Sequence, residues 1–367
     1  MANLLAKGLS SCKRWLNRHW AGRRTYSLRG SLELKRMRVK TLRERITSGL
    51  PFEHLSRCPF SRASGEICEQ TIVAVRDRYG FPVRLALCHC TGLLYLVDRL
   101  TQDGYERFYR SGLYRELTAS FFGGRLNDLV SKQQEGAKTN AELVINALRH
   151  QISLPNGATL LDVGGSTGAL AQAFVQAYKV QATVLDPAEK ELELAAALGL
   201  RTKLGQFEHA DFSEGEKYDV VVLNQMIEHV VDIRATFEKA RSLLKTQGHV
   251  VFDILDCLAE IEKVGCVEAA SRLDHCYFLY EEMVDVLCKR VGLVVAKRIR
   301  HTGISILYSC RPSAPDPHAT FPEERRLQVM RRLLDQDALW AKTPLVLRYP
   351  LDERLARFVK RVVGGRG

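Results

Sequence analysis

Two short segments, separated by the length of one helix, constrain the fold of this chain more than any other feature. The first is Leu160-Leu-Asp-Val-Gly-Gly-Ser-Thr-Gly168, where an apolar run predicts a buried strand and the glycines permit a sharp turn. The second is Ala182-Thr-Val-Leu-Asp-Pro187, an apolar run that ends in Asp186, eighteen residues after Gly168. Residues 169–177 between them have a helical pattern. Together they predict two neighbouring strands of an α/β protein with a helix between them.

This arrangement suits a ligand that carries a ribose. The carboxyl ends of adjacent strands in a doubly wound sheet face one crevice, so Asp186 is placed to accept hydrogen bonds from both ribose hydroxyls. A dinucleotide fingerprint requires Gly-x-Gly-x-x-Gly, and Ser166 stands at its middle glycine. Asp162, just before the turn, would attract an ammonium group and repel a pyrophosphate. The pattern therefore favours S-adenosylmethionine, although glycine turns and acids after strands are also ordinary connections in α/β proteins.

The downstream elements favour the ligand-site interpretation, because each expected element follows in order. The pattern predicts strands at residues 218–224, 249–255, 293–300 and 304–310, helices at 232–244 and 280–291, and a turn at 245–248. The link between the last two strands, residues 301–303, is so short that they must pair antiparallel. We therefore expect a mostly parallel, Rossmann-like sheet of seven strands with a terminal antiparallel hairpin, unlike a nicotinamide-binding domain.

These residues resemble the class I S-adenosylmethionine-dependent methyltransferases over about residues 157–312. Residues 161–168 are similar to the first motif of that family, Asp186 to its ribose-binding acid, residues 224–230 to the segment after its fourth strand, and residues 243–248 to its Leu-Lys-Pro-Gly-Gly turn. The resemblance implies that S-adenosylmethionine is the cofactor. The implied cofactor-binding residues are Asp162, Gly164, Gly165, Gly168, Asp186, Gln206, Phe207 and Asn224.

The chain departs from that family pattern at three places. Ser166 replaces a usual glycine, Thr246-Gln247 replaces Pro-Gly, and Gln206-Phe207 stands where an adenine-binding Asp is common. Adenine selection then depends on the Gln206 amide at the edge of the base and on the Phe207 ring packed on its face.

Methyl transfer requires a nucleophile aligned with the methyl group and, for a hydroxyl acceptor, a base. Our first candidate for the base is His229, with Glu228 as an orienting partner or cofactor contact, because both follow the fourth strand of the predicted sheet. His275 is the second candidate, in the connection after the fifth strand. A structural role remains open for both histidines. Residues 100–109 and Tyr114 predict an aromatic helix and loop that either covers the acceptor side or packs between domains.

Ten cysteines occur in a chain without an evident export signal, so reduced thiols are expected. The segment from Cys58 to Tyr114 resembles a zinc-ribbon module that precedes some methyltransferases of sugar and envelope polysaccharide pathways. Cys58 and Cys88 stand at two ligand positions, but Ser61 and Thr91 occupy the other two. We assign no metal ligands: either Cys68 with Cys90 or His89 completes a zinc site, or the module is held by apolar packing alone.

The net charge of +12 lies in the flanks. Residues 1–50 contain 13 Lys/Arg against 2 acids, and residues 311–367 contain 12 against 7, so the remaining residues carry about −4. Without a basic core we do not expect nucleic acid as a partner. Apolar residues at helical spacing between residues 5 and 20 predict a basic amphipathic helix that contacts an anionic membrane, docks on the protein or belongs to a transit peptide. The C-terminal tail predicts helices near 327–339 and 351–363 that dock or form a homodimer.

The sequence thus predicts an α/β chain of five parts. These are a basic helical extension (1–50), a degenerate ribbon-like module and cover (51–125), a helical linker (126–156), the methyltransferase domain (157–312) and a second basic helical extension (313–367). We expect methyl transfer to a small-molecule or lipid-linked saccharide of envelope polysaccharide biosynthesis. The alternatives are a small metabolite or lipid as acceptor, or a binding protein whose chemistry has lapsed. With no apolar run of about 18 residues, we expect a cytoplasmic protein, either soluble or peripheral at the inner face of the membrane.

Overall fold

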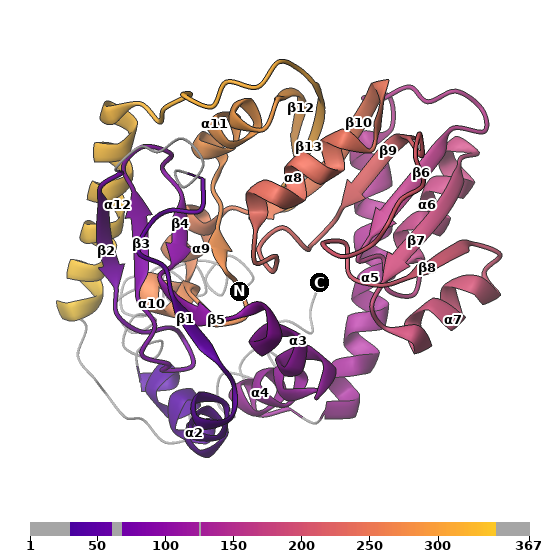
Figure 1. Ribbon diagram of the computed structural model, residues 1–367. Helices are drawn as coiled ribbons and strands as arrows, with labels where there is room; N and C mark the ends of the chain where they lie inside the picture. The colour runs from indigo at the N-terminus through magenta and orange to yellow at the C-terminus, as the bar shows by residue number, and fades with distance from the viewer. Residues whose placement is uncertain (1–29, 61–67, 125, 343–367) are drawn as a thin grey trace, which may run out of the picture.

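Two larger β-sheets and one two-stranded sheet organise the computed structural model, which describes residues 30–60, 68–124 and 126–342 (Figure 1). The predicted helices at residues 5–20 and 351–363 lie outside the described residues. The larger sheet consists of β6 (Thr159–Val163), β7 (Gln181–Asp186), β8 (Arg201–Leu204), β9 (Tyr218–Leu223), β10 (Leu244–Leu255), β12 (Leu293–Arg300) and β13 (Ser305–Pro312).

The strand order of this sheet is β12-β13-β10-β9-β6-β7-β8. The first five of these strands along the chain, β6 to β10, pair in parallel, whereas β13 is antiparallel to both β10 and β12. The expected mixed α/β fold is confirmed. The chain enters at β6, moves outward to β8 and returns to β9, so the order reverses between β6 and β9. Ligands bind α/β sheets at such a reversal, outside the carboxyl ends of the strands.

Helices cover both faces of this sheet because its strands alternate between two cores. On one face Leu160, Val184 and Val220 pack under α5 (Leu126–Leu148), α6 (Ala169–Tyr178) and α7 (Glu189–Ala197). On the other, Leu161 and Val221 pack toward α8 (Ile233–Ser242) and α11 (Glu281–Arg290). Buried strands with both faces covered explain the nearly continuous apolar runs in the sequence.

The turn expected at residues 245–248 is wrong, because β10 already begins at Leu244. Leu244 pairs with Tyr218 and His249 with Val220, so the ladder contains a register shift between them. The four residues in between are accommodated opposite one residue of β9. A Cβ on Gly248 would lie 3.0 Å from the carbonyl oxygens of Lys245 and Tyr218, so this irregular stretch requires glycine.

The smaller sheet joins the N-terminal part of the chain to a segment far along the sequence. Its order is β11-β4-β3-β2, with β2 (Gln70–Ala74), β3 (Leu85–Cys88), β4 (Leu94–Leu96) and β11 (Tyr277–Phe278). The edge strand β11 belongs to the excursion after β10, which also forms α9 (Cys257–Val264) and α10 (Val267–Ala270). Tyr277 pairs with Tyr95, and the buried Arg99 side chain donates to the Tyr277 hydroxyl at 3.2 Å.

The remaining described elements surround these sheets (Figure 1). Residues 30–38 and α2 (Lys40–Gly49) are helical, β1 (Phe52–His54) pairs antiparallel with β5 (Asp98–Leu100), and α3 (Gln102–Arg110) and α4 (Leu113–Phe122) lie between the sheets. The tail helix α12 (Glu323–Lys342) docks on α9 and α10 through Val329 and Leu333. Within the described part of the chain, none of the helices combines the length and apolarity that a membrane span requires.

Candidate functional site

The turn after β6 adopts backbone conformations that explain its glycines. Gly164 and Gly168 have φ of +68° and +77°, in the left-handed region. A Cβ on Gly168 would lie 2.5 Å from Leu200, and one on Gly165 would lie 2.6 Å from Asp162 Oδ2. At Gly164 the nearest such contact is at 3.9 Å, so this position keeps the turn open. The turn therefore packs closely against the rest of the protein at Gly165 and Gly168, and its backbone remains accessible at Gly164.

Asp186, at the end of β7, fixes the geometry of this turn. Its Oδ2 accepts a hydrogen bond from the Ser166 amide at 2.9 Å, and its Oδ1 accepts one from the Ala188 amide at 2.8 Å. Ser166 has φ of +49°, which costs energy for a residue other than glycine, and the bond to Asp186 holds it there. A carboxylate offers about four lone-pair sites, so Asp186 retains acceptors for two hydroxyls. Burial raises the pKa of this carboxyl above its ordinary value.

Asp162 is the clearest sign that the site suits a cationic ligand. It is 1 % exposed, and its Oδ2 has no hydrogen-bond partner among the described residues. Burial, with a smaller contribution from Asp186, raises the pKa of Asp162 to about 7. A buried carboxylate oxygen without a partner is costly unless a ligand supplies one. An ammonium group such as that of S-adenosylmethionine fits this position.

The segment that follows β9 lies opposite the glycine turn. The Met226 side chain is the one that a Cβ on Gly164 would approach at 3.9 Å. Asn224 accepts from the Asn140 amide group of α5 at 2.7 Å, while its own buried Nδ2 has no partner in the described residues. Gln225 has φ of +51°, and its amide donates to Asp253 Oδ1 at 2.6 Å. Asn224 Nδ2 therefore makes no well-formed hydrogen bond in the described residues and has only a weaker contact with the Asp253 carboxylate.

The two residues predicted to contact the adenine, Gln206 and Phe207, differ in how accessible they are to a ligand. Gln206 is half-buried, and its Oε1 accepts from Gln102 of α3 at 3.3 Å. Phe207 is 3 % exposed and packs edge-on against Phe212, with ring centroids 6.2 Å apart. Phe207 thus belongs to the core and offers a ligand little ring surface, whereas the Gln206 amide remains at the surface of the crevice.

His229, the first candidate base, has a defined tautomer. Its Nδ1 lies 2.8 Å from the backbone carbonyl oxygen of Asp274 and 2.9 Å from the Tyr109 hydroxyl, which itself donates to that carbonyl at 3.1 Å. A carbonyl oxygen only accepts, so Nδ1 carries the hydrogen and Nε2 keeps its lone pair. Burial lowers the pKa of His229 below its ordinary value. The side chain is therefore a neutral imidazole with a basic nitrogen available.

The structure brings His275 to His229, with ring centroids 4.5 Å apart. His275 is 6 % exposed, and burial lowers its pKa well below the ordinary value, whereas His229 is half-buried. His229 is thus the more accessible of the two. Both are neutral near pH 7.

Glu228 is held away from this pair. It is 4 % exposed, its Oε1 accepts from the Leu255 amide at 3.1 Å, and its backbone oxygen accepts from the Cys276 amide at 2.7 Å. Burial and the neighbouring Asp253 raise the pKa of Glu228 to about 7. Glu228 therefore anchors the loop after β9 to the end of β10, and the Asp274 carbonyl orients His229 instead.

Helices from before the larger sheet supply three residues that touch the site. Gln102 contacts Gln206, Tyr109 contacts His229, and Asn140 contacts Asn224. The aromatic helix was expected as a cover or as packing, and Tyr109 does contact a candidate base. The two amide residues were missed, because an isolated Gln or Asn on a helix carries no motif.

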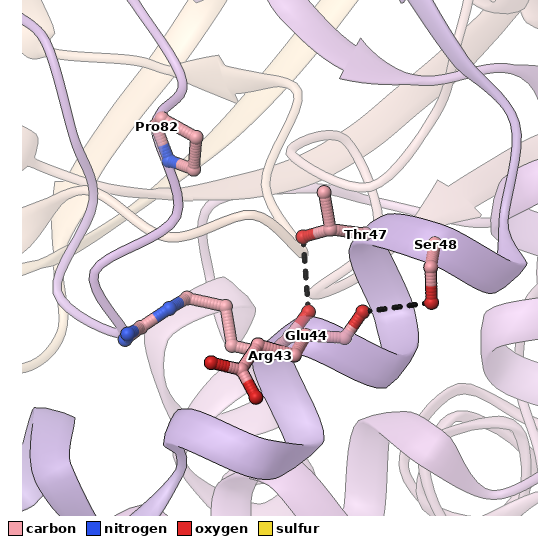
Figure 2. A pocket seen from close by; sticks show the side chains of 5 residues that line it. All are labelled: Arg43, Glu44, Thr47, Ser48 and Pro82. Atoms are coloured by element: carbon pink, nitrogen blue, oxygen red, sulfur yellow. Dashed lines mark hydrogen bonds between the residues drawn. The ribbon is translucent and has the colours of Figure 1, made fainter.

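Two surface pockets lie elsewhere. Figure 2 shows one of about 260 Å³, on α2 beside Pro82, where the Thr47 and Ser48 hydroxyls bond the Arg43 and Glu44 carbonyls at 2.9 and 3.0 Å. The other, of about 380 Å³, lies between α2 and α3. None of the residues that line either pocket is a candidate cofactor or base residue, so both pockets lie apart from the candidate site.

Comparison with known proteins finds matches to the central part of the chain. Residues 137–297 match the family model of a methyltransferase domain. Ubiquinone biosynthesis O-methyltransferases of Vibrio cholerae and Bordetella avium are 36 % and 32 % identical to this chain over 107 and 106 residues. Each match covers 27 % of this chain and 43 % or 44 % of the relative, so the chain spans less than half the length of these curated relatives.

The solved structures that match this chain are less similar in sequence. A mitomycin 7-O-methyltransferase is 19 % identical, with a TM-score of 0.44 over 57 % of this chain and 60 % of that one. A magnesium protoporphyrin IX methyltransferase from Synechocystis is 17 % identical, with a TM-score of 0.42 over 57 % and 98 %. The family match agrees with the methyltransferase activity that the sequence predicts for this part of the chain.

Proposed function

We propose that this protein transfers the methyl group of S-adenosylmethionine to a hydroxyl oxygen of a small or lipid-linked acceptor. The observation that carries the proposal is the neutral His229, which presents Nε2 with a free lone pair. It lies on the loop that begins opposite the glycine turn, where its own amide donates to the Met226 carbonyl at 2.9 Å. A base beside a cofactor crevice is what oxygen methylation requires.

Four side chains provide the cofactor contacts. Asp162 Oδ2, which has no partner among the described residues, would accept from the ammonium group, and Asp186 would accept from the ribose hydroxyls. Asn224 Nδ2 and the Gln206 amide would contribute neutral hydrogen bonds. When bound, the cofactor supplies an electrophilic methyl group on its sulfonium. The protein therefore has mainly to align the acceptor and remove its proton.

His229 Nε2 would take the hydroxyl proton as the acceptor oxygen attacks the methyl carbon. The resulting imidazolium keeps its Nδ1 hydrogen on the Asp274 carbonyl oxygen, which stabilises the new positive charge. Tyr109 shares this carbonyl and limits rotation of the ring. His275 is the second candidate for the same role, because its ring lies against that of His229.

Two acceptor classes follow from different observations. The resemblance of the segment from Cys58 to Tyr114 to modules of envelope polysaccharide pathways supports a saccharide, free or lipid-linked. The curated relatives are O-methyltransferases of ubiquinone biosynthesis, which supports a small hydroxylated metabolite or lipid as the second class. Three further properties remain predictions: a cytoplasmic location, homodimer formation and membrane contact through residues 1–20. Residues 1–20 lie outside the described part of the chain.

The test measures methyl transfer from isotope-labelled S-adenosylmethionine to panels of nucleotide sugars, lipid-linked saccharides and hydroxylated quinone precursors. On the active acceptor, His229→Gln should lower kcat by about 10² to 10⁴ while cofactor affinity stays within about twofold. His209→Gln, at an exposed turn position, is the matched control. The kcat of the wild type should rise with pH as His229 loses its proton, through a midpoint below the ordinary histidine pKa.

Unchanged turnover of the His229 variant would remove it as the base. The donor atoms of His229, Asp274 and His275 also lie within 4.8 Å of one another, a spacing that suits a metal ion. Turnover is therefore compared with and without added Mg²⁺ or Mn²⁺, and stimulation by the metal would reassign His229 from base to ligand. Cofactor binding without transfer to any acceptor would favour the lapsed-enzyme alternative.

A further inference from the structure

Four cysteines from separate positions along the chain converge at one end of the smaller sheet. Cys88 ends β3, Cys90 lies in the turn that follows, and Cys58 and Cys68 precede β2. Cys68 Sγ lies 3.2 Å from Cys88 Sγ and is joined to Cys90 Sγ as a disulfide. Cys58 is within side-chain hydrogen-bond contact of Cys88, and its Sγ is 3.6 Å from the Thr91 hydroxyl. The four sulfur atoms thus form one cluster.

We propose that these four cysteines, with the Cys68–Cys90 pair reduced, form a tetrahedral thiolate site for one Zn²⁺ ion. Four thiolates are a donor set that selects zinc, and a site with four protein ligands and no open position is structural rather than catalytic. Cys58 and Cys88 are 2 % and 0 % exposed, as expected for a closed site. This proposal is independent of the acceptor and the base.

The neighbouring polar side chains are directed away from the sulfur atoms. His89 Nε2 lies 2.8 Å from the Thr71 hydroxyl and its Nδ1, which makes no hydrogen bond among the described residues, lies 3.4 Å from a Glu69 carboxylate oxygen, so the ring is directed toward β2. The buried Thr91 hydroxyl accepts from the Leu93 amide at 3.3 Å and serves the turn. The alternative in which His89 completes the ligand set is therefore disfavoured, and sulfur remains as the only type of donor in the described cluster.

The backbone of the turn is arranged to stabilise thiolates. The Cys90 amide donates to Cys68 Sγ at 3.0 Å, and the Gly92 amide donates to the Cys88 carbonyl at 2.9 Å to close the turn. Gly92 has φ of +71°, and a Cβ there would lie 2.8 Å from Phe321 and the Tyr280 hydroxyl. The turn that carries two of the ligands is thus fixed by packing against Tyr280, the residue before α11, and Phe321 of the tail.

This ligand set differs from that of the zinc-ribbon modules that the segment resembles. In those modules, pairs of cysteines separated by two residues supply the metal, whereas Ser61 and Thr91 occupy two of these positions here. The structure instead places Cys68 and Cys90 beside the two that remain. The inference concerns this rewired set, and it assigns both new cysteines a function.

The disulfide and the metal exclude each other, because both use the sulfur atoms of Cys68 and Cys90. Reduction by two equivalents of a small thiol converts the disulfide into two cysteine thiols and yields one oxidised thiol pair. Zinc binding then releases the thiol protons as the four thiolates form. Oxidation of the site by a disulfide reagent reverses both steps and expels the ion.

The experiment measures zinc in the full-length protein purified with a phosphine reductant and without chelator. We expect about one zinc ion per chain, and Co²⁺ reconstitution should give the intense visible bands of tetrahedral thiolate cobalt. Cys68→Ser and Cys90→Ser should each lower the metal content at least about tenfold, consistent with loss of one of four ligands. Cys266→Ser is the matched control, because Cys266 caps α10 by accepting from Ala269 and serine can do the same.

A disulfide reagent should release the zinc into a colorimetric chelator, and a thiol should restore binding. The proposal is overturned if the reduced, zinc-reconstituted wild type retains no ion. It is equally overturned if both the Cys68 and the Cys90 variants bind zinc as the wild type does. Circular dichroism of each variant distinguishes loss of a ligand from loss of the fold. Cofactor binding is measured in parallel, so failure of the zinc site and failure of the methyltransferase proposal give different results.

Discussion

At the scale of single residues, the chemistry of the site depends on groups that are buried without full pairing. Asp162 Oδ2 and Asn224 Nδ2 both lack partners among the described residues, and both lie near the glycine turn. Buried unpaired polar atoms destabilise a folded protein, so they persist where a ligand completes them. Binding of the cofactor should therefore raise the free energy of unfolding of this domain by more than the area buried by the cofactor alone predicts.

Asp162 predicts a pH dependence of cofactor affinity. Because the pKa of this carboxyl in the free protein is raised to about 7, the negative charge that attracts the ammonium appears only as pH rises through that value. Near pH 6 about one tenth of the side chains are ionised, so affinity should be about tenfold lower than at full ionisation. Calorimetric titration with S-adenosylmethionine between about pH 5.5 and 7.5 measures this.

Asp162→Asn should bind weakly at every pH in that range and lose the dependence. The exposed Asp211→Asn variant should follow the wild type. A wild-type affinity that does not change with pH would show that Asp162 is not the group that meets the ammonium.

The pair Glu228-His229 shows how far residue-level prediction extends. Its position after β9 was identified from the sequence, but the assignment of partners was not. Glu228 bonds the Leu255 amide, while His229 turns to Asp274 and Tyr109, which are distant in the sequence. Adjacent residues in a compact turn direct their side chains differently, so adjacency in the sequence does not establish a hydrogen bond.

At the scale of elements, the glycine turn and α6 form a unit whose shape depends on packing against α7. Gly168 caps α6 in a left-handed conformation, and its Cα faces Leu200 and Ala195. Gly168 therefore meets two requirements, a left-handed backbone and close packing of its Cα. Substitutions at two different glycines can test the two requirements separately.

Gly168→Ala should destabilise the protein by about 2 to 4 kcal/mol, from left-handed strain plus a clash with Leu200. Gly199 is the matched control, because it has a similar φ of +79° but no atom within 4 Å of its added Cβ. Gly199→Ala should therefore cost only the strain, about 1 to 2 kcal/mol. Urea unfolding measures both, and equal losses for the two variants would contradict the role of close packing at Gly168.

Most of the larger sheet was predicted, because most of its strands carry an apolar run and each helix its own period; the edge strand β8, with the sequence Arg-Thr-Lys-Leu, carries none and was not placed. The strands at 218–224, 249–255, 293–300 and 304–310 correspond to β9, β10, β12 and β13 within a few residues. The short strand β11 was not predicted, and the start of β10 was placed too late. Both depend on pairing with a distant partner rather than on local pattern.

At the scale of the whole molecule, the two sheets share one core. The larger hydrophobic cluster includes residues from the N-terminal sheet, the excursion after β10 and one face of the larger sheet. Tyr277 joins these parts, since its hydroxyl accepts from Arg99 and donates to the Val231 carbonyl at 2.7 Å. Such continuity favours one cooperative unfolding transition.

We therefore expect urea unfolding followed by tryptophan fluorescence and by circular dichroism to give coincident transitions. Tyr277→Phe should lower the free energy of unfolding by about 1 to 3 kcal/mol with both probes, because it leaves Arg99 and the Val231 carbonyl without this partner. Tyr178→Phe is the control, since the Tyr178 hydroxyl has no partner in the described structure and its loss should cost little. Two separate transitions, with only one shifted by Tyr277→Phe, would show that the sheets unfold independently.

The sequence by itself determined the α/β sheet, the glycine turn with Asp162 and Asp186, and the domain type, because these depend on local periodicity and on residues close together in the chain. Only the tertiary structure decided that His229 meets Tyr109, His275 and the Asp274 carbonyl, that β11 completes the N-terminal sheet, and that four cysteines converge. These contacts join segments separated by long stretches of chain. Their formation depends on how the packed elements bring side chains together, which no local pattern encodes.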